Sequence, residues 1–242
     1  MITYKVTSHR GNRMVNEDYT GMYQRKHEFC FLLADGLGGH GMGNIASQLV
    51  VEQAVTQFDR LGYGKAALMD MFEISQQKLM KKQRMERNIR GMKSTLVVLI
   101  VGKKDVLWGH IGDSRLYYFK DNRLVARTLD HSVPQMLALA GEIKEQEIRH
   151  HPDRNRLLKA MGIEWDTPAY ELSKQVKREG KQAFLLCSDG FWELIDEKVM
   201  TTCLRKSKSV EEWMERMETV VEKKGMGTDM DNYSAITVWI EE

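Results

Sequence analysis

The chain has 242 residues, of which 42% are hydrophobic and 29% are charged, and its formal net charge is +2. This balance is typical of a globular protein with a real core, and it gives no reason to expect nucleic acid or an anionic membrane as the main partner. No apolar run is long enough for a signal peptide or a membrane span, so we expect a soluble, cytoplasmic protein.

The first third of the chain is expected to hold two strands and then two helices. Residues 2–8 and 28–34 are short runs rich in β-branched and aromatic residues, which favours strands. Apolar residues then recur at intervals of three and four from Val51 to Leu61, as in an amphipathic helix. A second, longer helix is expected over about 65–87.

The middle of the chain is expected to be strand. Four short strand-like runs follow one another at residues 95–101, 106–111, 116–119 and 124–128. Turn-like sequences such as "GKKD" and "KDNR" separate them, which predicts hairpins.

The last part of the chain begins with a polar segment. Residues 141–161, "GEIKEQEIRHHPDRNRLLKAM", are charged and lack a periodic pattern, which predicts a surface excursion. A strand at 183–187, a helix with an apolar stripe from Val210 to Val221 and a strand at 235–240 complete the chain. Adjacent strand runs with helices early and late favour an α+β fold of antiparallel sheets covered by helices. No linker-like segment appears, so we expect one domain over residues 1–242.

The three cysteines are sparse and form no CxxC pair. Cys30 and Cys187 lie inside apolar strand-like runs, and Cys203 stands alone. We expect buried, reduced thiols rather than disulfides or a zinc site.

Acidic residues stand at strand ends or in turns throughout the chain. If the sheets bring these ends together, the carboxylates repel one another and raise each other's pKa, so a cation must neutralise them. Oxygen ligands without histidine or cysteine partners at metal spacing favour Mg²⁺ or Mn²⁺. Each acid taken alone is more simply a turn former, but the set together favours a metal site. The set is Glu17, Asp18, Asp35, Asp113, Asp189 and Asp231.

These segments resemble the metal-dependent protein phosphatases of the PP2C (PPM) type, in their compact bacterial form. The resemblance covers essentially the whole chain in order, and it implies a sandwich of two antiparallel β-sheets flanked by helices. The signatures are "RMVNED" from Arg13, "ADGLGGHGMG" from Ala34, "KSTLVV" from Lys93, "GHIGDSRLY" from Gly109, "LDHS" from Leu129, "LLCSDGFWEL" from Leu185 and "DNYSAITV" from Asp231.

The resemblance also implies a role for each matching residue. Asp35 would bridge two Mn²⁺ or Mg²⁺ ions. Asp189 and Asp231 would complete the first ion's ligands, and the Gly36 carbonyl would join the second. Glu17 and Asp18 would hold the second ion directly or through water. Asp113 matches a position that binds a third, weaker ion in bacterial members.

Arg13 matches the family's phosphate-binding arginine. Its planar guanidinium can meet two oxygens of a phosphate group at once. The implied reaction is hydrolysis of phosphoserine or phosphothreonine in proteins, by a metal-bridging hydroxide that attacks phosphorus in line.

Two positions depart from the family pattern. Animal members carry a histidine two residues after the bridging aspartate, where this chain has Leu37. The nearest histidine is His40, which either donates a proton to the leaving group or braces the loop. Many bacterial relatives also carry Glu where this chain has Asn44.

The excursion at 141–161 matches the family's flap. We expect it to shape substrate access, with His150 or His151 near the cleft. The expected partners are phosphorylated proteins, including a bacterial Ser/Thr kinase, and the protein is expected to be a monomer. Two alternatives stay open, a non-catalytic metal-binding pseudophosphatase that docks a partner and an anti-anti-sigma-factor phosphatase.

Overall fold

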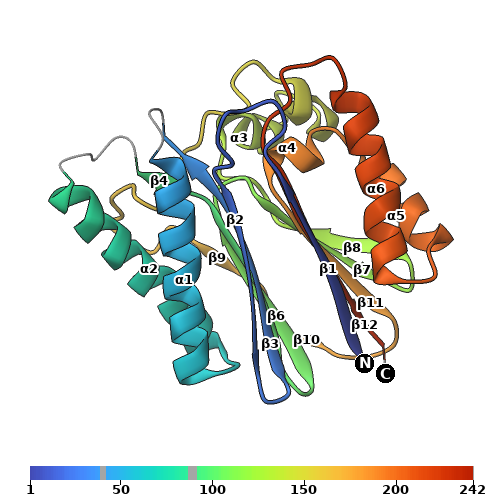
Figure 1. Ribbon diagram of the computed structural model, residues 1–242, viewed down its shortest axis with the longest axis horizontal. Coiled ribbons are helices and arrows are strands. Elements are labelled where there is room, and N and C mark those ends of the chain that lie inside the picture. The colour runs from blue at the N-terminus through green and yellow to red at the C-terminus, as the bar shows by residue number, and fades with distance from the viewer. Residues whose placement is uncertain (39–41, 87–91, 242) are drawn as a thin grey trace.

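The computed structural model describes residues 1–38, 42–86 and 92–241, and its centre is a pair of β-sheets (Figure 1). Every strand pairing within these ranges is antiparallel. The five-stranded sheet has the order β1-β12-β11-β7-β8. Its strands are β1 (Ile2–His9), β12 (Tyr233–Ile240), β11 (Gln182–Cys187), β7 (Arg115–Lys120) and β8 (Arg123–Arg127).

The second sheet has seven strands. Five of them follow the order β10-β6-β5-β3-β2, while β4 pairs with β3 and β9 pairs with β6. These strands are β2 (Asp18–Arg25), β3 (Glu28–Leu37), β4 (Lys93–Ser94), β5 (Leu96–Val101), β6 (Asp105–Ile111), β9 (Glu171–Leu172) and β10 (Val176–Lys177).

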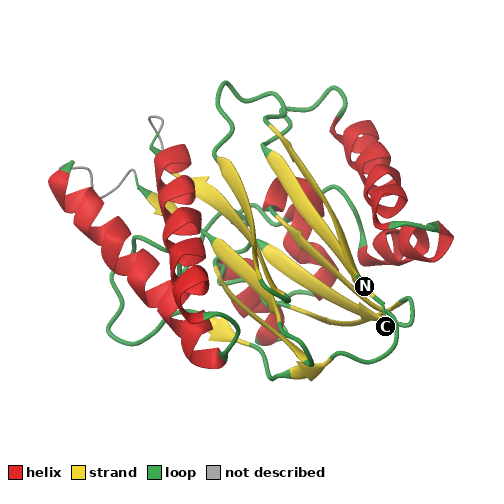
Figure 2. Ribbon diagram, turned by 60° about the horizontal axis from the view of Figure 1, so that its bottom comes forward, coloured by secondary structure: helices red, strands yellow, loops and turns green. Residues whose placement is uncertain are grey.

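Helices cover the outer faces of both sheets (Figure 2). The seven-stranded sheet packs against α1 (Gly43–Leu61) and α2 (Lys65–Met85). The five-stranded sheet packs against α4 (Asp189–Trp192), α5 (Glu197–Lys206) and α6 (Val210–Gly225). The predicted αββα sandwich is therefore confirmed.

Strand alternation divides the buried side chains into three cores. In β3, Phe31 and Leu33 face the other sheet, whereas Cys30 and Leu32 face the helices α1 and α2. Successive side chains of a strand point to opposite faces, so a strand buried on both faces reads as a continuous apolar run. The inter-sheet core fixes the position of one sheet relative to the other. It therefore also fixes how far apart the ends of their strands lie.

The segment after β8 leaves the sandwich and returns to it. It contains α3 (Val133–Leu139), which Ser132 caps by accepting a hydrogen bond from Gln135 N, and the 3₁₀ helix η1 (Glu145–His150). Residues 141–161 are mostly exposed, as predicted, and isolated bridges Ser132↔Leu157 and Ser94↔Met161 tie the returning chain to the sandwich.

All eight predicted strands exist, with bounds shifted by up to three residues. The pattern missed β2, the short strands β4, β9 and β10, and the helices α3, α4 and α5. Strand β2 was missed because Gly21 interrupts its pattern. That glycine is needed because an added Cβ would lie 2.5 Å from Val51 Cγ1 of α1.

Two further expectations can be compared with the described residues. All three cysteines are free and buried, as predicted. Within residues 1–38, 42–86 and 92–241, no helix is long and apolar enough to cross a membrane.

The inter-sheet core predicts a stability contrast. Leu186→Ala empties a fully buried position of this core and is expected to lower the free energy of unfolding by about 2–5 kcal/mol. Leu139→Ala, on a side chain that is 61% exposed, is expected to change it by less than about 0.5 kcal/mol. Urea unfolding of both variants measures the difference, and equal losses would contradict this description of the core.

Candidate functional site

The end of β3 places Asp35 between the two sheets. Asp35 follows Phe31 and Leu33 at two-residue intervals, so its side chain lies on the inter-sheet face, where the sandwich opens. We expected Asp35 just after the strand, but β3 continues to Leu37 because Gly36 and Leu37 pair with β4. Asp18 lies directly opposite Asp35 in the β2–β3 register and so shares its face.

Hydrogen bonds fix the backbone of Asp35. Its N–H donates to Thr95 Oγ1 at 2.8 Å, and its carbonyl accepts from Thr95 N at 2.8 Å and from Ser94 Oγ at 3.0 Å. These bonds occupy the main-chain groups and leave the carboxylate facing the opening. The Asp35 carboxylate therefore has a rigid base.

Two glycines allow close backbone contacts around the acids. A Cβ added to Gly36 would lie 2.2 Å from the Gly43 carbonyl oxygen, where β3 meets the start of α1. A Cβ added to Gly190 would lie 2.1 Å from the Asn232 carbonyl oxygen, where α4 meets the segment before β12. In the Asp-Gly pairs at 35–36 and 189–190, the glycine therefore lets a neighbouring backbone segment pack directly beside the aspartate, because any side chain at the glycine would clash with it.

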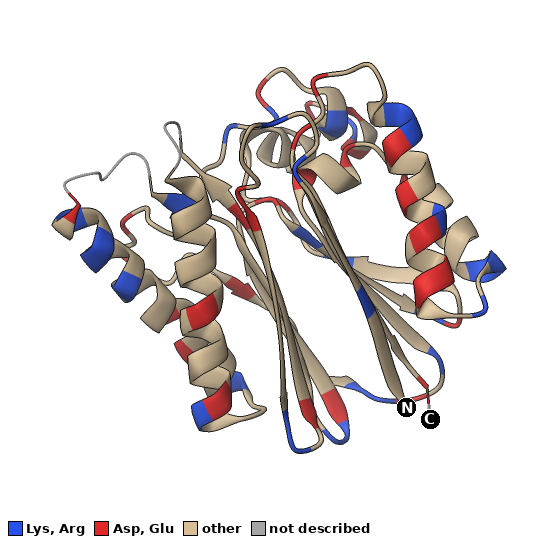
Figure 3. Ribbon diagram, in the orientation of Figure 1, with Lys and Arg blue, Asp and Glu red and all other residues tan. Residues whose placement is uncertain are grey.

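The five-stranded sheet contributes acids at the same end. Asp189 begins α4 directly after β11, and Asp231 stands just before β12. Asp113 lies in the turn between β6 and β7, where its carbonyl accepts a 2.9 Å hydrogen bond from Trp192 Nε1. Figure 3 shows acidic positions at this end of both sheets.

Asn232 holds the loop that carries Arg13 and Glu17. Its Nδ2 donates to the carbonyls of Arg10 at 2.8 Å and Val15 at 3.0 Å, and its Oδ1 accepts from Glu17 N at 2.8 Å. Asn232 is only 6% exposed, so the loop between β1 and β2 is tethered by a buried side chain. Asn232 lies in the "DNYSAITV" signature, but its position in the sequence alone does not reveal this tethering role.

Most of the predicted site residues line one cleft of about 610 Å³. Asp18 is buried beside it, and Ser188 Oγ donates to its Oδ2 at 2.8 Å. His40 lies outside the described residues, so the structure does not test it as a proton donor. The predicted residues that line the cleft are Arg13, Glu17, Asp35, Gly36, Asp113, Asp189 and Asp231.

Burial and mutual repulsion raise the pKa of the clustered carboxyls. Burial, with the neighbouring Asp189, raises the pKa of Asp35 and of Asp113 well above the ordinary range. Burial also raises the pKa of Asp18 to about 7, although Ser234 and Ser188 oppose the shift by hydrogen bonding. Burial, then Glu193 and Asp231, raise the pKa of Asp189 to about 7.

Arg13 neutralises one of these acids directly. Its Nε and Nη2 lie 3.0 and 3.1 Å from the two carboxylate oxygens of Asp231, a bidentate pair. This bond to Asp231 raises the pKa of the guanidinium. This ion pair was not predicted, because the resemblance implies phosphate binding for Arg13 and metal binding for Asp231.

The donor set fits hard divalent cations. Asp18 Oδ1 and Asp113 Oδ1 are buried and have no hydrogen-bond partner among the described residues, which leaves two oxygens able to accept a cation. All predicted ligand atoms are carboxylate or carbonyl oxygens, the type that Mg²⁺ and Mn²⁺ prefer. A cation bound among them would reverse the repulsion that raises the carboxyl pKa values.

A second group of potential ligands lies outside this cleft. His110, His131 and Glu171 place ligand atoms within 4.8 Å of one another. However, the imidazole rings stack 13° from parallel, so their in-plane lone pairs do not converge on one ion. His131 Nδ1 accepts from Gly112 N at 3.1 Å, so its proton is on Nε2, which faces Glu171 at 3.3 Å. We interpret this group as a hydrogen-bonded brace for the turn before Asp113.

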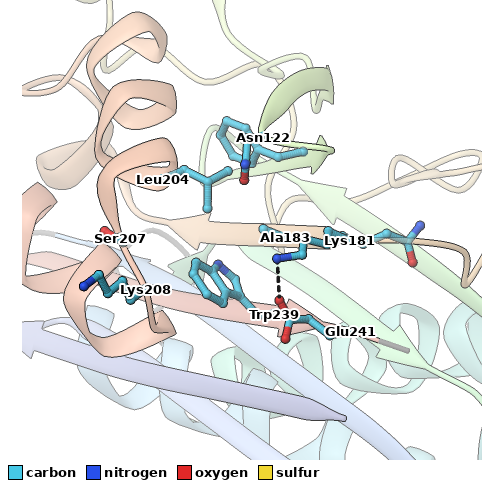
Figure 4. Close-up of a pocket in the computed structure, with 10 residues that line it drawn as sticks. Asn122, Lys181, Ala183, Leu204, Ser207, Lys208, Trp239 and Glu241 are labelled. Carbon is cyan, nitrogen blue, oxygen red and sulfur yellow. Dashed lines mark ion pairs between the residues drawn. The ribbon is translucent and has the colours of Figure 1, made fainter.

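A separate hollow of about 350 Å³ lies on the helix side of the five-stranded sheet (Figure 4). Ala183 forms its floor between its cross-strand neighbours Phe119 and Trp239, and a small residue between two aromatic ones leaves the space. Lys181 and Glu241 pair at 3.4 Å at its edge. The hollow contains none of the clustered acids.

The residues of the excursion that line the acidic cleft differ from those that were expected. Asn155 and Leu157 line the cleft, whereas His150 lines a different hollow beside α5. His151 Nδ1 accepts a hydrogen bond from Asp153 N within the excursion itself. Neither His150 nor His151 lines the cleft, and His150 lies beside α5 because the Arg149–Glu197 pair holds η1 there.

Comparison with known proteins adds independent information. The protein phosphatase 2C family profile matches residues 7–233. The chain is 29% identical to a serine/threonine phosphatase stp of Listeria welshimeri, covering 92% of this chain and 89% of that protein. It is 28% identical to the protein phosphatase PhpP of Streptococcus pneumoniae, covering 95% of this chain and 94% of that protein.

Solved structures share the fold over the full length. The serine/threonine phosphatase PstP/Ppp of Mycobacterium tuberculosis superposes with a TM-score of 0.87 and 28% identity, covering all of this chain and 99% of that one. A PstP catalytic domain in complex with two manganese ions gives a TM-score of 0.84 and 26% identity, covering all of this chain and 99% of that one.

The raised carboxyl pKa values predict how pH affects the metal-free protein. Asp189 has a pKa of about 7 when folded, above its ordinary value of 3.8, so the folded state binds the proton more tightly. Its contribution to stability is therefore lost as the pH rises from about 4 to about 7. In EDTA, Asp189→Asn should gain stability relative to the parent protein over this range, as measured by urea unfolding. Parallel pH profiles would contradict the prediction.

The close contact at Gly190 predicts a steric effect. Gly190→Ala brings a methyl group against the Asn232 carbonyl and is expected to lower the free energy of unfolding by about 2 kcal/mol or more. Gly64→Ala is the matched control, because nothing lies within 4 Å of its added Cβ and its backbone is extended. Urea unfolding measures both variants, and similar small effects would show that the contact is not tight.

Proposed function

The chain belongs to the protein phosphatase 2C family, and on that premise we propose that it hydrolyses phosphoserine and phosphothreonine in proteins by a metal-dependent reaction. Membership of this family makes the protein a serine/threonine phosphatase. The metal-dependent route is our proposal for how this chain performs that reaction.

One observation carries the proposal. Carboxylates from both sheets and the guanidinium of Arg13 line the same cleft, which is open at the end of the sandwich. Asp113 in the cleft and Asp18 beside it each have a buried oxygen with no hydrogen-bond partner in the described part of the chain. Such an arrangement is costly unless cations occupy it, and a phosphate dianion is a ligand that such cations and an arginine would share.

We assign the metal ligands as the resemblance implies. Asp35 would lie between two ions, Asp189 and Asp231 would serve the first, and the Gly36 carbonyl with Glu17 or Asp18 would serve the second. Asp113 would serve a third, weaker ion. When bound, Mn²⁺ or Mg²⁺ would supply positive charge to the phosphate oxygens and would lower the pKa of a coordinated water. The related PstP structure with two manganese ions supports Mn²⁺ as the first metal to test.

Arg13 would bind and orient the phosphate group. In the structure its fork is paired with Asp231, and Asp229 lies 3.9 Å from its Nη1. With Asp231 holding a cation, the two guanidinium N–H groups of Arg13 would be available to two phosphate oxygens. The tether through Asn232 would keep Arg13 at the cleft during this exchange.

The rigid frame would hold these groups in place without an induced rearrangement. The Asp35 backbone is bonded to Ser94 of β4 and to Thr95, which lies between β4 and β5. Trp192 holds the Asp113 carbonyl. Fixed charges and donors act most effectively when they need not reorganise during the reaction. We further propose that residues 1–242 work as one domain, with 141–161 as a flap that places Asn155 and Leu157 at the cleft.

The proposed partners are phosphorylated proteins, including a Ser/Thr kinase, and the proposed form is a cytoplasmic monomer. A pseudophosphatase that binds metal and docks a partner is the competing function. The presence of Asp35, Asp189 and Asp231 together with Arg13 favours catalysis, because loss of a ligand is the expected mark of an inactive relative.

The central experiment measures turnover of a small phosphate ester and a phosphothreonine peptide in EDTA, Mg²⁺ or Mn²⁺. Activity should require the divalent ion, and Asp35→Asn or Asp189→Asn should reduce it on the order of 100-fold or more, because each variant removes a ligand charge. Asp166→Asn, at an exposed aspartate outside the cleft, is the matched control and should keep full activity. No turnover by a folded protein with either metal would favour the pseudophosphatase.

A further inference from the structure

The rim of the acidic cleft is apolar beside Arg13. Met14 and Val15 follow Arg13 directly and line the cleft, yet their side chains are 88% and 45% exposed. Leu37, from the end of β3, and Leu157, from the excursion, line the same cleft and are half-buried. Three separate segments therefore bring apolar side chains to the edge of a cleft whose floor is charged.

The loop that carries Met14 and Val15 is held in place. The Val15 carbonyl accepts from Asn232 Nδ2 at 3.0 Å, Asn12 N donates to the Met230 carbonyl at 2.9 Å, and Asn16 Nδ2 donates to Ser8 Oγ at 2.9 Å. These bonds fix the loop on both sides of the two apolar residues. The side chains are thus presented at the surface by a tethered backbone.

Single exposed apolar side chains are ordinary on protein surfaces, but a group of them around a charged cleft is typical of a binding site. Consecutive residues of an extended polypeptide lie about 3.3–3.6 Å apart. If Arg13 binds the phosphate, the residues next to the phosphorylated one in the substrate would therefore reach the rim at Met14 and Val15. A small phosphate ester has no neighbouring residues and could not make these contacts.

Charged groups around the cleft favour an apolar neighbour over an acidic one. Arg154 of the excursion lines an adjoining hollow to which Arg13 also contributes, but its Nε is 3.1 Å from a carboxylate oxygen of Glu193. Glu193 neutralises the charge of Arg154, which would otherwise attract an acidic side chain of the substrate. Within the described part of the cleft edge, the apolar rim is therefore the surface best suited to bind a side chain of the substrate, and that side chain would be apolar.

We propose that Met14 and Val15, with Leu37 and Leu157, form a subsite for apolar side chains next to the phosphorylated residue of a protein substrate. This inference rests on the proposed phosphatase function and names the class of substrate that the site prefers. The contacts with phosphate contribute the same binding free energy for every substrate. Contact with the rim adds binding free energy only for phosphoproteins whose phosphorylated residue has leucine-like residues beside it.

The test compares two phosphothreonine peptides that differ only in having leucine or serine on both sides of the phosphorylated residue. The parent protein, loaded with Mn²⁺, should have a kcat/KM about fivefold higher for the leucine peptide, as expected for partial burial of apolar surface at an open rim. The difference should arise mainly in KM, because the rim does not touch the reacting phosphate.

The double variant Met14→Gln/Val15→Thr keeps the size of both side chains and makes them polar. Each variant's peptide rates are divided by its own rate on a small phosphate ester, so that a general loss of activity or folding cancels. The preference for the leucine peptide should then fall to within about twofold. Met85→Gln is the control, because Met85 is 71% exposed at the end of α2 and does not line the cleft, and it should keep the full preference.

The outcomes separate this inference from the function on which it rests. Equal kcat/KM values for the two peptides, with ester turnover intact, would overturn the subsite and leave the phosphatase function standing. If the double variant still prefers the leucine peptide, the subsite is likewise overturned and the phosphatase function stands. A third peptide with aspartate neighbours that was preferred to both would overturn the subsite in favour of Arg154. No turnover of the ester or of any peptide would overturn the proposed function, and the subsite with it.

Discussion

Carboxylates that are buried at the same end of a β-sandwich repel one another, and the fold has to hold them together against this repulsion. Asp18 and Asp35 face each other across two paired strands, and Asp189 and Asp231 come from the opposite sheet. Burial raises the pKa of most of these groups, so without cations the site costs stability near neutral pH. The inter-sheet core and the helix-covered faces offset this cost. The fold thereby holds a charge arrangement that divalent ions would complete.

The periodicity of the sequence predicted most of the scaffold. The strands that failed to appear in the pattern are edge or very short strands, such as β2, whose side chains are only half-buried. Helix α5 was missed because valine and two threonines give it a low helix propensity, and burial of Met200, Cys203 and Leu204 compensates for this. Helix α3 carried a readable signal, a serine cap followed by proline, which the analysis did not use.

The acids of the site were found because strand ends and Asp-Gly pairs are visible in sequence, and the resemblance to a family ordered them. What could not be predicted depends on tertiary contacts. Asn232 tethers a loop 215 residues away from it in sequence, and Arg13 pairs with Asp231 across a similar separation. The exposure of residues 141–161 was predicted, but the side chains that this segment brings to the cleft were not, because a polar segment without periodicity does not reveal which face turns inward.

Anomalous diffraction at the manganese edge, from crystals of the protein grown with Mn²⁺, is the most direct test of the carboxylate metal site. Two strong peaks are expected in the cleft, both within coordination distance of Asp35 and about 3.5–4 Å apart, as in other two-metal sites. A single peak at the His110, His131 and Glu171 group, or no peak beside Asp35 at saturating Mn²⁺, would contradict the assignment of the carboxylate cleft as the metal centre.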